Sequence, residues 1–179
     1  LCISNEASQA YMFGGCDHRR PPGPNAELYK LDMSDPSGFY WQKIEVAGGA
    51  AAPSARWHHT ATMSGGTMIV FGGFSGSKTY RYYNDVWLLD TASDKWSQPA
   101  AGACDVTAAG EVKLKRPWAN VPAPRGAHSA TVIERRLLCF GGYGGAGFSR
   151  KDFNDLCALH LDTWEWEEIE CFGDPPEPR

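Results

Sequence analysis

The sequence lacks the segments that would place it in a membrane or mark it for secretion. No apolar run approaches the roughly 20 residues that a helix needs to span a bilayer. Residues 1–6 contain neither the basic region nor the apolar stretch of a signal peptide. With 42% hydrophobic and 21% charged residues among 179, the composition is that of an ordinary globular chain, long enough to bury a core.

Zinc-finger and redox motifs are also missing. The six cysteines include no C-x-x-C pair, and no histidine stands at zinc-finger spacing, which excludes the simplest metal sites. Cys139 and Cys157 lie inside apolar strand patterns, where a free thiol behaves as a small hydrophobe. Unpaired thiols and the absence of an N-x-S/T sequon favour a reducing, intracellular and hence cytoplasmic location.

An internal repeat organises the chain. Residues 53–96 contain P-x-x-R-x-x-H, an apolar run ending in Phe-Gly-Gly, an Asn-Asp-apolar-aromatic element and a spaced Trp, and residues 122–166 contain the same elements in the same order. A first copy aligns on the Gly pair at 14–15, which sets Leu1 level with His59. Its last turn, before Trp41, is three residues longer than in the other copies. Because the chain begins inside one copy and ends at the start of another, we expect it to be part of a longer protein.

Each copy predicts four short strands, and no long segment has a convincing helical period. In the second copy the first strand is expected at 59–63, and the second, at 68–71, is continuously apolar, as in a strand covered on both faces. The third, at 86–89, is of the same kind. The fourth mixes a Trp with charged residues, which is typical of an exposed edge strand. Identical sheets stacked around an axis would cover the apolar strands on both sides, which predicts an all-β propeller.

At these residues the chain resembles the Kelch-repeat family. The resemblance implies four-stranded antiparallel blades, with the Gly pairs closing the second strands and Trp41, Trp96 and Trp166 on the fourth. We therefore expect a truncated blade at 1–46, a second blade at 47–101, an insertion at 102–121, a third blade at 122–171 and the start of a fourth repeat at 172–179. Two departures stand out: Cys157 replaces an aromatic residue, and the first copy has no Asn-Asp.

The connections of such blades predict a functional face. In a four-stranded meander the long segments at 14–26, 72–84, 97–121 and 141–154 emerge at one end, and only tight turns emerge at the other. The long segments carry nine basic and four acidic residues, a local charge of +5, whereas the rest of the chain carries −9. Long loops on a rigid scaffold often bind partners, and Tyr, Trp and Arg often anchor interfaces. The alternative is that these charges are merely solvated. The candidate partner-binding residues are Arg19, Arg20, Lys78, Tyr80, Arg81, Tyr82, Lys113, Lys115, Arg116, Trp118, Tyr143, Arg150 and Lys151.

Motifs for chemistry are weak. Residues 142–147 satisfy G-x-G-x-x-G, but the segment that follows duplicates the second copy, where no such glycine run precedes it. The adjacent His58 and His59 would point to opposite faces of a strand and could not easily share a metal ion. We therefore expect no catalytic residue, metal or cofactor, although a copper oxidase resembling galactose oxidase, with its centre outside this chain, stays an alternative.

The leading hypothesis is a non-enzymatic scaffold or adaptor, cytoplasmic and in some settings cytoskeletal. Its basic, aromatic face would bind an acidic or phosphorylated segment of another protein. Further blades of the parent chain would be its other partners. Nucleic acid is a weaker alternative for the same face.

Overall fold

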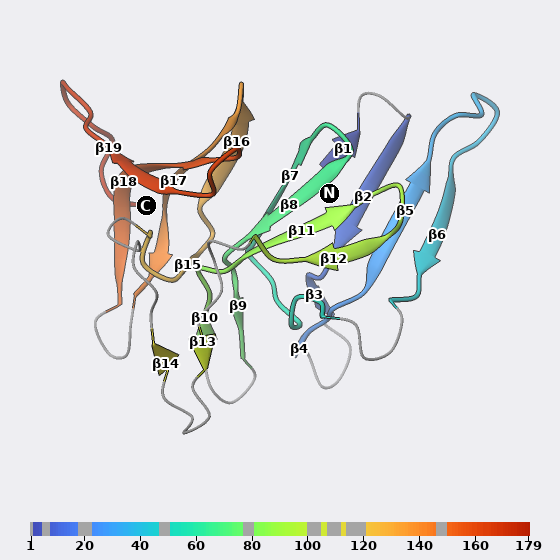
Figure 1. Cartoon of the computed structure of the whole chain (residues 1–179), viewed down its shortest axis with the longest axis horizontal. Helices are drawn as coiled ribbons and strands as arrows, with labels where there is room; N and C mark the ends of the chain where they lie inside the picture. The colour runs from blue at the N-terminus through green and yellow to red at the C-terminus, as the bar shows by residue number, and fades with distance from the viewer. Residues whose placement is uncertain are drawn as a thin grey trace.

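The computed structural model describes residues 2–4, 8–17, 23–46, 51–76, 81–99, 105–106, 112–113, 121–145 and 150–179. Within these residues every regular element is a strand, as expected, and the strands form three antiparallel four-stranded blades (Figure 1). Blade 1 consists of β1 (Cys2–Ser4), β2 (Gln9–Phe13), β5 (Leu28–Asp32) and β6 (Tyr40–Ile44). Blade 2 consists of β7 (Thr60–Ser64), β8 (Thr67–Phe71), β11 (Val86–Asp90) and β12 (Lys95–Ser97). Blade 3 consists of β16 (Ser129–Ile133), β17 (Arg136–Gly144), β18 (Lys151–His160) and β19 (Trp166–Ile169).

Short strands lie outside the blade meanders. They are β3 (Cys16–Asp17), β4 (Gly23–Pro24), β9 (Phe74–Ser75), β10 (Arg81–Tyr82), β13 (Asp105–Val106), β14 (Val112–Lys113) and β15 (Arg125–Gly126). The pairs β3–β4, β9–β10 and β13–β14 all lie at the lower end in Figure 1, together with the lower ends of β17 and β18. The expectation that the long connections share one end is thus confirmed for the described residues. We call this the long-loop end.

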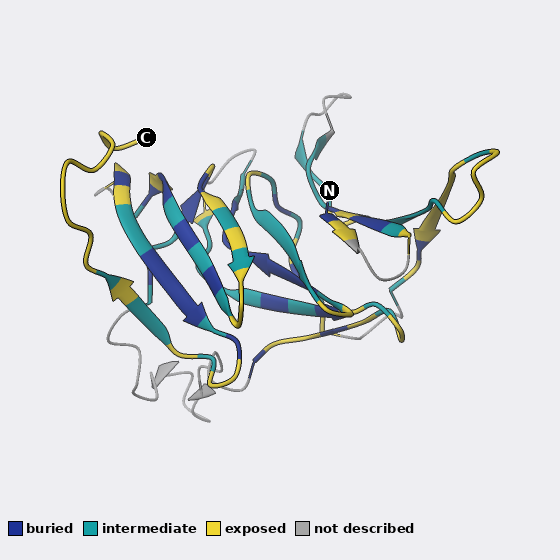
Figure 2. Ribbon diagram, turned by 90° about the horizontal axis from the view of Figure 1, so that it is seen from above, coloured by how far each residue is buried: buried dark blue, intermediate teal, exposed yellow. Residues whose placement is uncertain are grey.

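The blades bury their cores against one another. Tyr11 and Phe13 of blade 1 pack with Val70 and Trp96 of blade 2 in one apolar cluster. A second cluster joins blade 2 to blade 3 and contains Ile69, Phe71, Leu137, Cys139 and Leu159. Alternate residues of β8 therefore face opposite neighbours, which explains why this strand is apolar throughout. Figure 2 shows the buried residues concentrated on the middle strands, with exposed residues along the C-terminal segment.

Two of the apolar strands are less enclosed than their sequences indicate, the third strand of blade 2 and the second strand of blade 3. Val86 and Leu88 in β11 are half-buried, and so are Leu138 and Phe140 in β17. In β17 the reason is that blade 2 covers only the face that carries Leu137 and Cys139. In β11, Val86 and Leu88 pack against the cluster shared with blade 3 but stay partly exposed, so an apolar run predicts a strand without fixing how completely each face is covered.

The register of blade 1 corrects the gapless alignment. Cys2 pairs with Tyr11, whereas in blade 2 it is Thr62 that pairs with Ile69. Since Tyr11 and Ile69 are equivalent, Cys2 occupies the place of Thr62, and the assignment of Leu1 to the level of His59 is wrong by two residues. The cause is the turn: four residues separate Ser4 from Gln9, but only Gly65 and Gly66 separate the strands of blade 2.

Other strand boundaries agree with the sequence or move slightly. Trp41, Trp96 and Trp166 pair with equivalent leucines in the third strands, as the repeat predicts. The first strand of blade 2 begins at Thr60 rather than at His59. Residues 151–160 form a strand, so the G-x-G-x-x-G at 142–147 is not followed by the helix that a dinucleotide site needs.

Candidate functional site

Two buried arginines hold the long-loop end together. Arg56 is completely buried, and its guanidinium binds both carboxylate oxygens of Asp85 at 2.6 and 3.0 Å and the carbonyl of Gly72 at 3.0 Å. Its own carbonyl accepts the N–H of Gly15 at 2.9 Å. The side chain thus binds its own blade while the backbone binds the preceding one. A buried, bidentate pair of this kind fixes geometry strongly.

Blade 3 repeats this arrangement with Arg125. Its guanidinium binds the two oxygens of Asp155 at 2.6 and 2.7 Å, and its carbonyl accepts the N–H of Gly73 at 2.8 Å. Burial acts to raise the pKa of Asp155, but the hydrogen bonds and charge of Arg125 outweigh it and hold that pKa below the usual value. The carboxylate is therefore ionised at neutral pH. Arg179 accepts the N–H of Gly142 at 2.7 Å, so its backbone takes the same position on blade 3.

The residue two positions after each acidic residue donates to its carboxylate. Trp87 Nε1 lies 2.8 Å from Asp85 Oδ2, and the Cys157 thiol lies 3.6 Å from Asp155 Oδ2. Blade 1 keeps the pattern with different residues, since the hydroxyl of Tyr29 donates to Glu27 at 3.3 Å. Cys157 therefore keeps the hydrogen-bond position of the aromatic residue that it replaces, without the ring.

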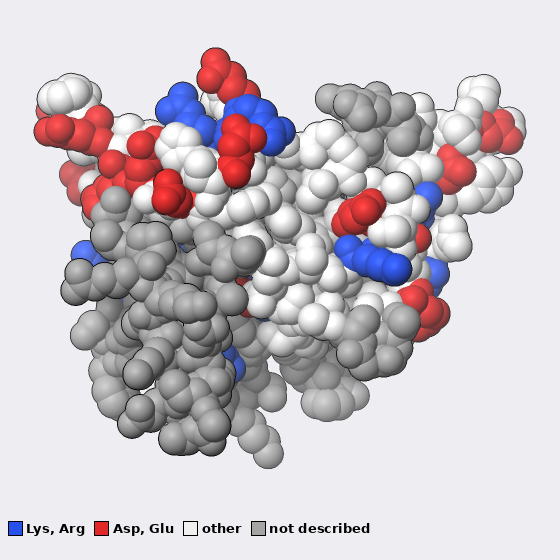
Figure 3. Space-filling view, viewed as in Figure 1, with Lys and Arg blue, Asp and Glu red and all other residues white. Residues whose placement is uncertain are grey.

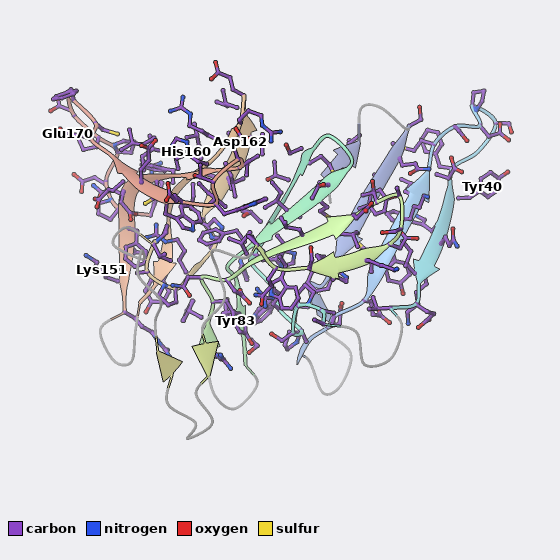
Figure 4. The ribbon with its side chains drawn as sticks, in the orientation of Figure 1. Tyr40, Tyr83, Lys151, His160, Asp162 and Glu170 are labelled. Atoms are coloured by element: carbon purple, nitrogen blue, oxygen red, sulfur yellow. The ribbon has the colours of Figure 1, made fainter. Side chains whose placement is uncertain are left out.

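Each arginine also supports an aromatic ring. The guanidinium carbon of Arg56 lies 4.2 Å from the ring centre of Tyr83, and that of Arg125 lies 4.1 Å from Phe153. A second, exposed cation lies near each ring: Arg81 at 5.3 Å from Tyr83 and Lys151 at 5.6 Å from Phe153. Figure 4 labels Tyr83 and Lys151 toward the long-loop end, opposite His160 and Asp162. Blades 2 and 3 therefore present equivalent, ring-supported cations at this end.

Similar cavities lie beside these cations. One, of about 270 Å³, is lined by Ser54, Arg81, Tyr83 and Trp87 among others. Its equivalent on blade 3, of about 380 Å³, is lined by Ala123, Lys151, Phe153 and Cys157 among others. Each cavity lies between a blade and the segment that leads into it.

A cluster of five rings spans the junction of blades 2 and 3. The ring of Phe74 lies at its centre, 5.0 Å from Trp57, 5.4 Å from His58 and 5.1 Å from Tyr82 between ring centroids. The rings of Phe74 and His58 are stacked at an angle of 11°. Tyr82 in turn meets Tyr143 of blade 3 edge to face at 5.9 Å. We call Trp57, His58, Phe74, Tyr82 and Tyr143 the junction cluster.

The guanidinium of Arg150 joins this cluster. Its carbon lies 5.3 Å from the ring centre of Tyr82, and the side chain is exposed. Asp152 is also exposed and stands directly opposite Tyr143 in the β17–β18 pairing. The cluster therefore combines rings with the cation of Arg150, and the carboxylate of Asp152 lies at its edge.

The structure brings together five of the residues predicted from sequence. Arg81, Tyr82, Tyr143, Arg150 and Lys151 all lie on the paired strands of the long-loop end or beside them. Lys113 lies in β14, where only its backbone is described. Arg19, Arg20, Lys78, Tyr80, Lys115, Arg116 and Trp118 lie outside the described residues.

Three cluster residues are not among the candidates predicted from sequence: Trp57, His58 and Phe74, the last of which begins β9 inside the long segment at 72–84. Trp57 and His58 stand in the linker before β7, and in blade 3 their places are taken by Gly126 and Ala127. The signal that could have found them is this difference between otherwise similar copies. His58 also lies outside the strand, with φ of 52°, so the argument from alternating strand faces does not apply to it. It is nevertheless exposed, whereas the equivalent pair His59 and His128 is enclosed.

Acidic side chains gather on one part of the surface of blade 3. Figure 3 shows acidic side chains gathered over the sheet that contains β18 and β19. The residues after His160 supply many of them: Asp162, Glu165, Glu167, Glu168 and Glu170. Among the described residues, no three His, Cys, Asp or Glu side chains are grouped to hold a metal ion, and no helix is long and apolar enough to cross a membrane.

Comparison with known proteins agrees with this architecture. The family model described as the KLHDC2/KLHL20/DRC7 Kelch-repeats domain matches residues 1–114. The chain belongs to the Kelch-repeat family. In the general sense that applies to Kelch repeats, it is a protein-interaction module, and its blades are those of a Kelch β-propeller.

The relatives of this Kelch-repeat chain are much longer proteins. It is 34% identical over 94% of its length to the dynein alpha chain of the flagellar outer arm of Chlamydomonas reinhardtii, of which it covers 3%. It is 31% identical over 90% of its length to acyl-CoA-binding domain-containing protein 4 of Arabidopsis thaliana, covering 20% of that protein. Kelch domain-containing protein 1 of Mus musculus is 29% identical over 94% of the chain, which spans 41% of that protein. The chain thus spans less than half of each of these relatives.

Proposed function

We propose that this Kelch-repeat chain is a non-enzymatic scaffold or adaptor that binds an acidic or phosphorylated protein segment through its long-loop end. The observation that carries the proposal is the position of Arg150 over Tyr82, which itself contacts Tyr143 across the junction of two blades. Aromatic residues and arginine supply most of the energy at typical interfaces. Cations that lie over rings lose less freedom on binding than cations that move freely in solvent.

The charge distribution supports a partner segment that is negatively charged. Arg81, Arg150 and Lys151 are exposed at this end, while Figure 3 shows acidic side chains gathered over the sheet that contains β18 and β19, of which Glu168 reaches the cavity beside Lys151. A negatively charged segment would therefore approach the long-loop end and be repelled elsewhere. A cytoplasmic protein associated with the cytoskeleton fits this function, and the relative in a flagellar dynein supports that setting.

A charge-reversal experiment tests the proposal. Binding of three synthetic peptides, one Glu-rich, one phosphorylated and one neutral, is measured by fluorescence anisotropy at about 50 and 200 mM salt. We expect the two anionic peptides to bind more tightly than the neutral one, and to lose affinity with salt. The double variant Arg81→Glu with Arg150→Glu should lose that preference.

The matched control is the double variant Lys95→Glu with Arg135→Glu. Both residues are exposed cations away from the long-loop end, one on the outer strand β12 and one in the turn before β17, so their reversal changes the net charge by the same amount but leaves the long-loop end intact. Equal loss in this control and in the double variant of Arg81 and Arg150 would show that only net charge matters. Equal binding of all three peptides by the unmodified chain would contradict the proposal.

A further inference from the structure

We propose that the junction cluster is a subsite for a single aryl phosphate group, the chemistry that a phosphotyrosine side chain carries. This inference rests on the proposed function and names the side chain that the long-loop end takes from its partner. The ligand would place its ring against Tyr143 and His58 and its phosphate beside Arg150. It would be one side chain of a protein segment, not a polynucleotide.

The rings provide the surface for an aromatic ligand. Tyr143 is 41% exposed although it contacts Tyr82, and His58 is exposed although one face of its ring is stacked on Phe74. Both rings are therefore held by neighbours on one side and meet solvent on another. Aromatic pairs in offset or edge-to-face contact gain energy beyond simple burial, so a ligand ring gains more here than on an isolated side chain.

Arg150 provides the group for the phosphate. Its guanidinium carbon lies 5.3 Å from the ring centre of Tyr82, whereas the next residue, Lys151, lies beside Phe153 in the neighbouring cavity. An arginine fork matches the geometry of two phosphate oxygens, and the charge-assisted bonds are about twice as strong as neutral ones. Asp152 acts in the opposite direction, because its exposed carboxylate stands across from Tyr143. Its removal should therefore strengthen the binding of an anion.

In the part of the chain that the structure describes, the cluster occupies the junction of blades 2 and 3, which sets the size of the ligand. Among the described residues, blade 1 has Gly23 and Pro24 where blade 2 has Arg81 and Tyr82, so this ring and this cation are not repeated at those positions. A polynucleotide uses a basic groove that tracks several phosphates. The chain instead carries a net charge of −4, which disfavours a long polyanion. One ring with one phosphate is the ligand that fits.

Phenyl phosphate is the probe for this site. It is titrated against the chain by NMR, following the aromatic signals of His58, Tyr82 and Tyr143, in parallel with inorganic phosphate, phenol and uridine monophosphate. We expect phenyl phosphate to bind about three- to tenfold more tightly than inorganic phosphate or phenol, which is the gain that one aromatic contact supplies. Tyr143→Ala should remove the advantage over inorganic phosphate, and Arg150→Gln the advantage over phenol.

Two variants serve as controls, with thermal melting to verify folding. Tyr40→Ala removes a ring that is 62% exposed and lies away from the long-loop end in Figure 4, and it should leave every affinity unchanged. Asp152→Asn should tighten phenyl phosphate binding about two- to threefold.

Three results would overturn the subsite. They are equal affinity for phenyl phosphate and inorganic phosphate, equal affinity for phenyl phosphate and phenol, and tighter binding of uridine monophosphate, which would assign the cluster to nucleotides. The absence of binding would also overturn it. If the peptide experiment still shows charge-dependent binding in any of these cases, the proposed function stands and only the aryl phosphate subsite fails.

Discussion

The carboxylate of Asp155 receives two hydrogen bonds from the buried guanidinium of Arg125, at 2.6 and 2.7 Å, and the same pair recurs between Arg56 and Asp85. Each arginine is also bonded through its backbone to the blade before it. One residue per repeat therefore fixes both the loop of its own blade and the junction with the neighbouring one. The positions of the long-loop rings depend on this residue.

Replacement of Arg125 by Leu should destabilise the chain strongly. It leaves the Asp155 carboxylate without its partner and the carbonyl of Gly141 without a donor, and loss of one member of a buried pair costs about 3–5 kcal/mol. Urea denaturation measures the change. The control is Arg135→Leu, which removes an exposed pair with Asp162 and should cost about 0–1 kcal/mol. A loss of under about 1 kcal/mol in Arg125→Leu would show that the pair does not hold the junction.

Substitution of Gly72 by Ala tests the close approach between blades. A Cβ there would lie 2.7 Å from the carbonyl oxygen of Arg125 and 2.9 Å from the His128 ring, and the backbone has φ of 64°. Gly65 has a similar φ of 55° but open space around the added carbon. Both alanines incur the cost of the left-handed conformation, about 1–2 kcal/mol.

The difference between the two variants isolates the contact with blade 3. We expect Gly72→Ala to lower the free energy of unfolding by at least about 1–3 kcal/mol more than Gly65→Ala, because the atoms that it meets are backbone and an enclosed ring. Equal losses in urea denaturation would mean that the blades separate at little cost.

The repeat explains why so much of the architecture could be predicted. Aromatic residues recur at equivalent positions of successive copies. The ring of Phe13 lies 5.1 Å from that of Trp96 in the following blade, and the ring of Phe71 lies 4.8 Å from that of Trp166 in the blade after. Strand order, the fourth-strand Trp and the shared end of the long loops all follow from such equivalence. The residues that the copies share are therefore those that pack one blade against the next.

The candidate site could be predicted only in part because it lies where the copies differ. Trp57 and His58 have Gly126 and Ala127 as counterparts, so no pattern marks them, and their contact with Phe74 depends on how the linker enters the blade. The longer turn between β1 and β2 could not be predicted for the same reason, because the spacing of apolar residues does not reveal how many residues a turn contains. The positive charge of the long loops could be predicted from the sequence, but the contact between the rings of Tyr82 and Tyr143 could be found only in the structure.

Acid should destabilise the chain through two enclosed histidines. Burial lowers the pKa of His59 from 6.5 to about 4 and that of His128 from 6.5 to about 3, and nearby arginines add to the effect. Both folded pKa values lie below the unfolded value, so the unfolded state takes up protons first as pH falls. Stability from these groups is complete above pH 6.5, declines below it, and is fully lost once pH falls through the folded pKa values.

The expected loss at about pH 5 is on the order of 2 kcal/mol for each histidine, since each pKa unit corresponds to about 1.4 kcal/mol. Urea denaturation at about pH 7 and pH 5 measures it, with His128→Gln as the variant. Glutamine keeps a polar group near Thr60, whose hydroxyl lies 2.9 Å from His128 Nε2, but it does not titrate. We expect the variant to be less stable at pH 7 and to lose about half as much stability on acidification. A variant whose pH dependence matches that of the unmodified chain would assign the acid sensitivity to other groups, because the histidine is the only titratable group that the substitution removes.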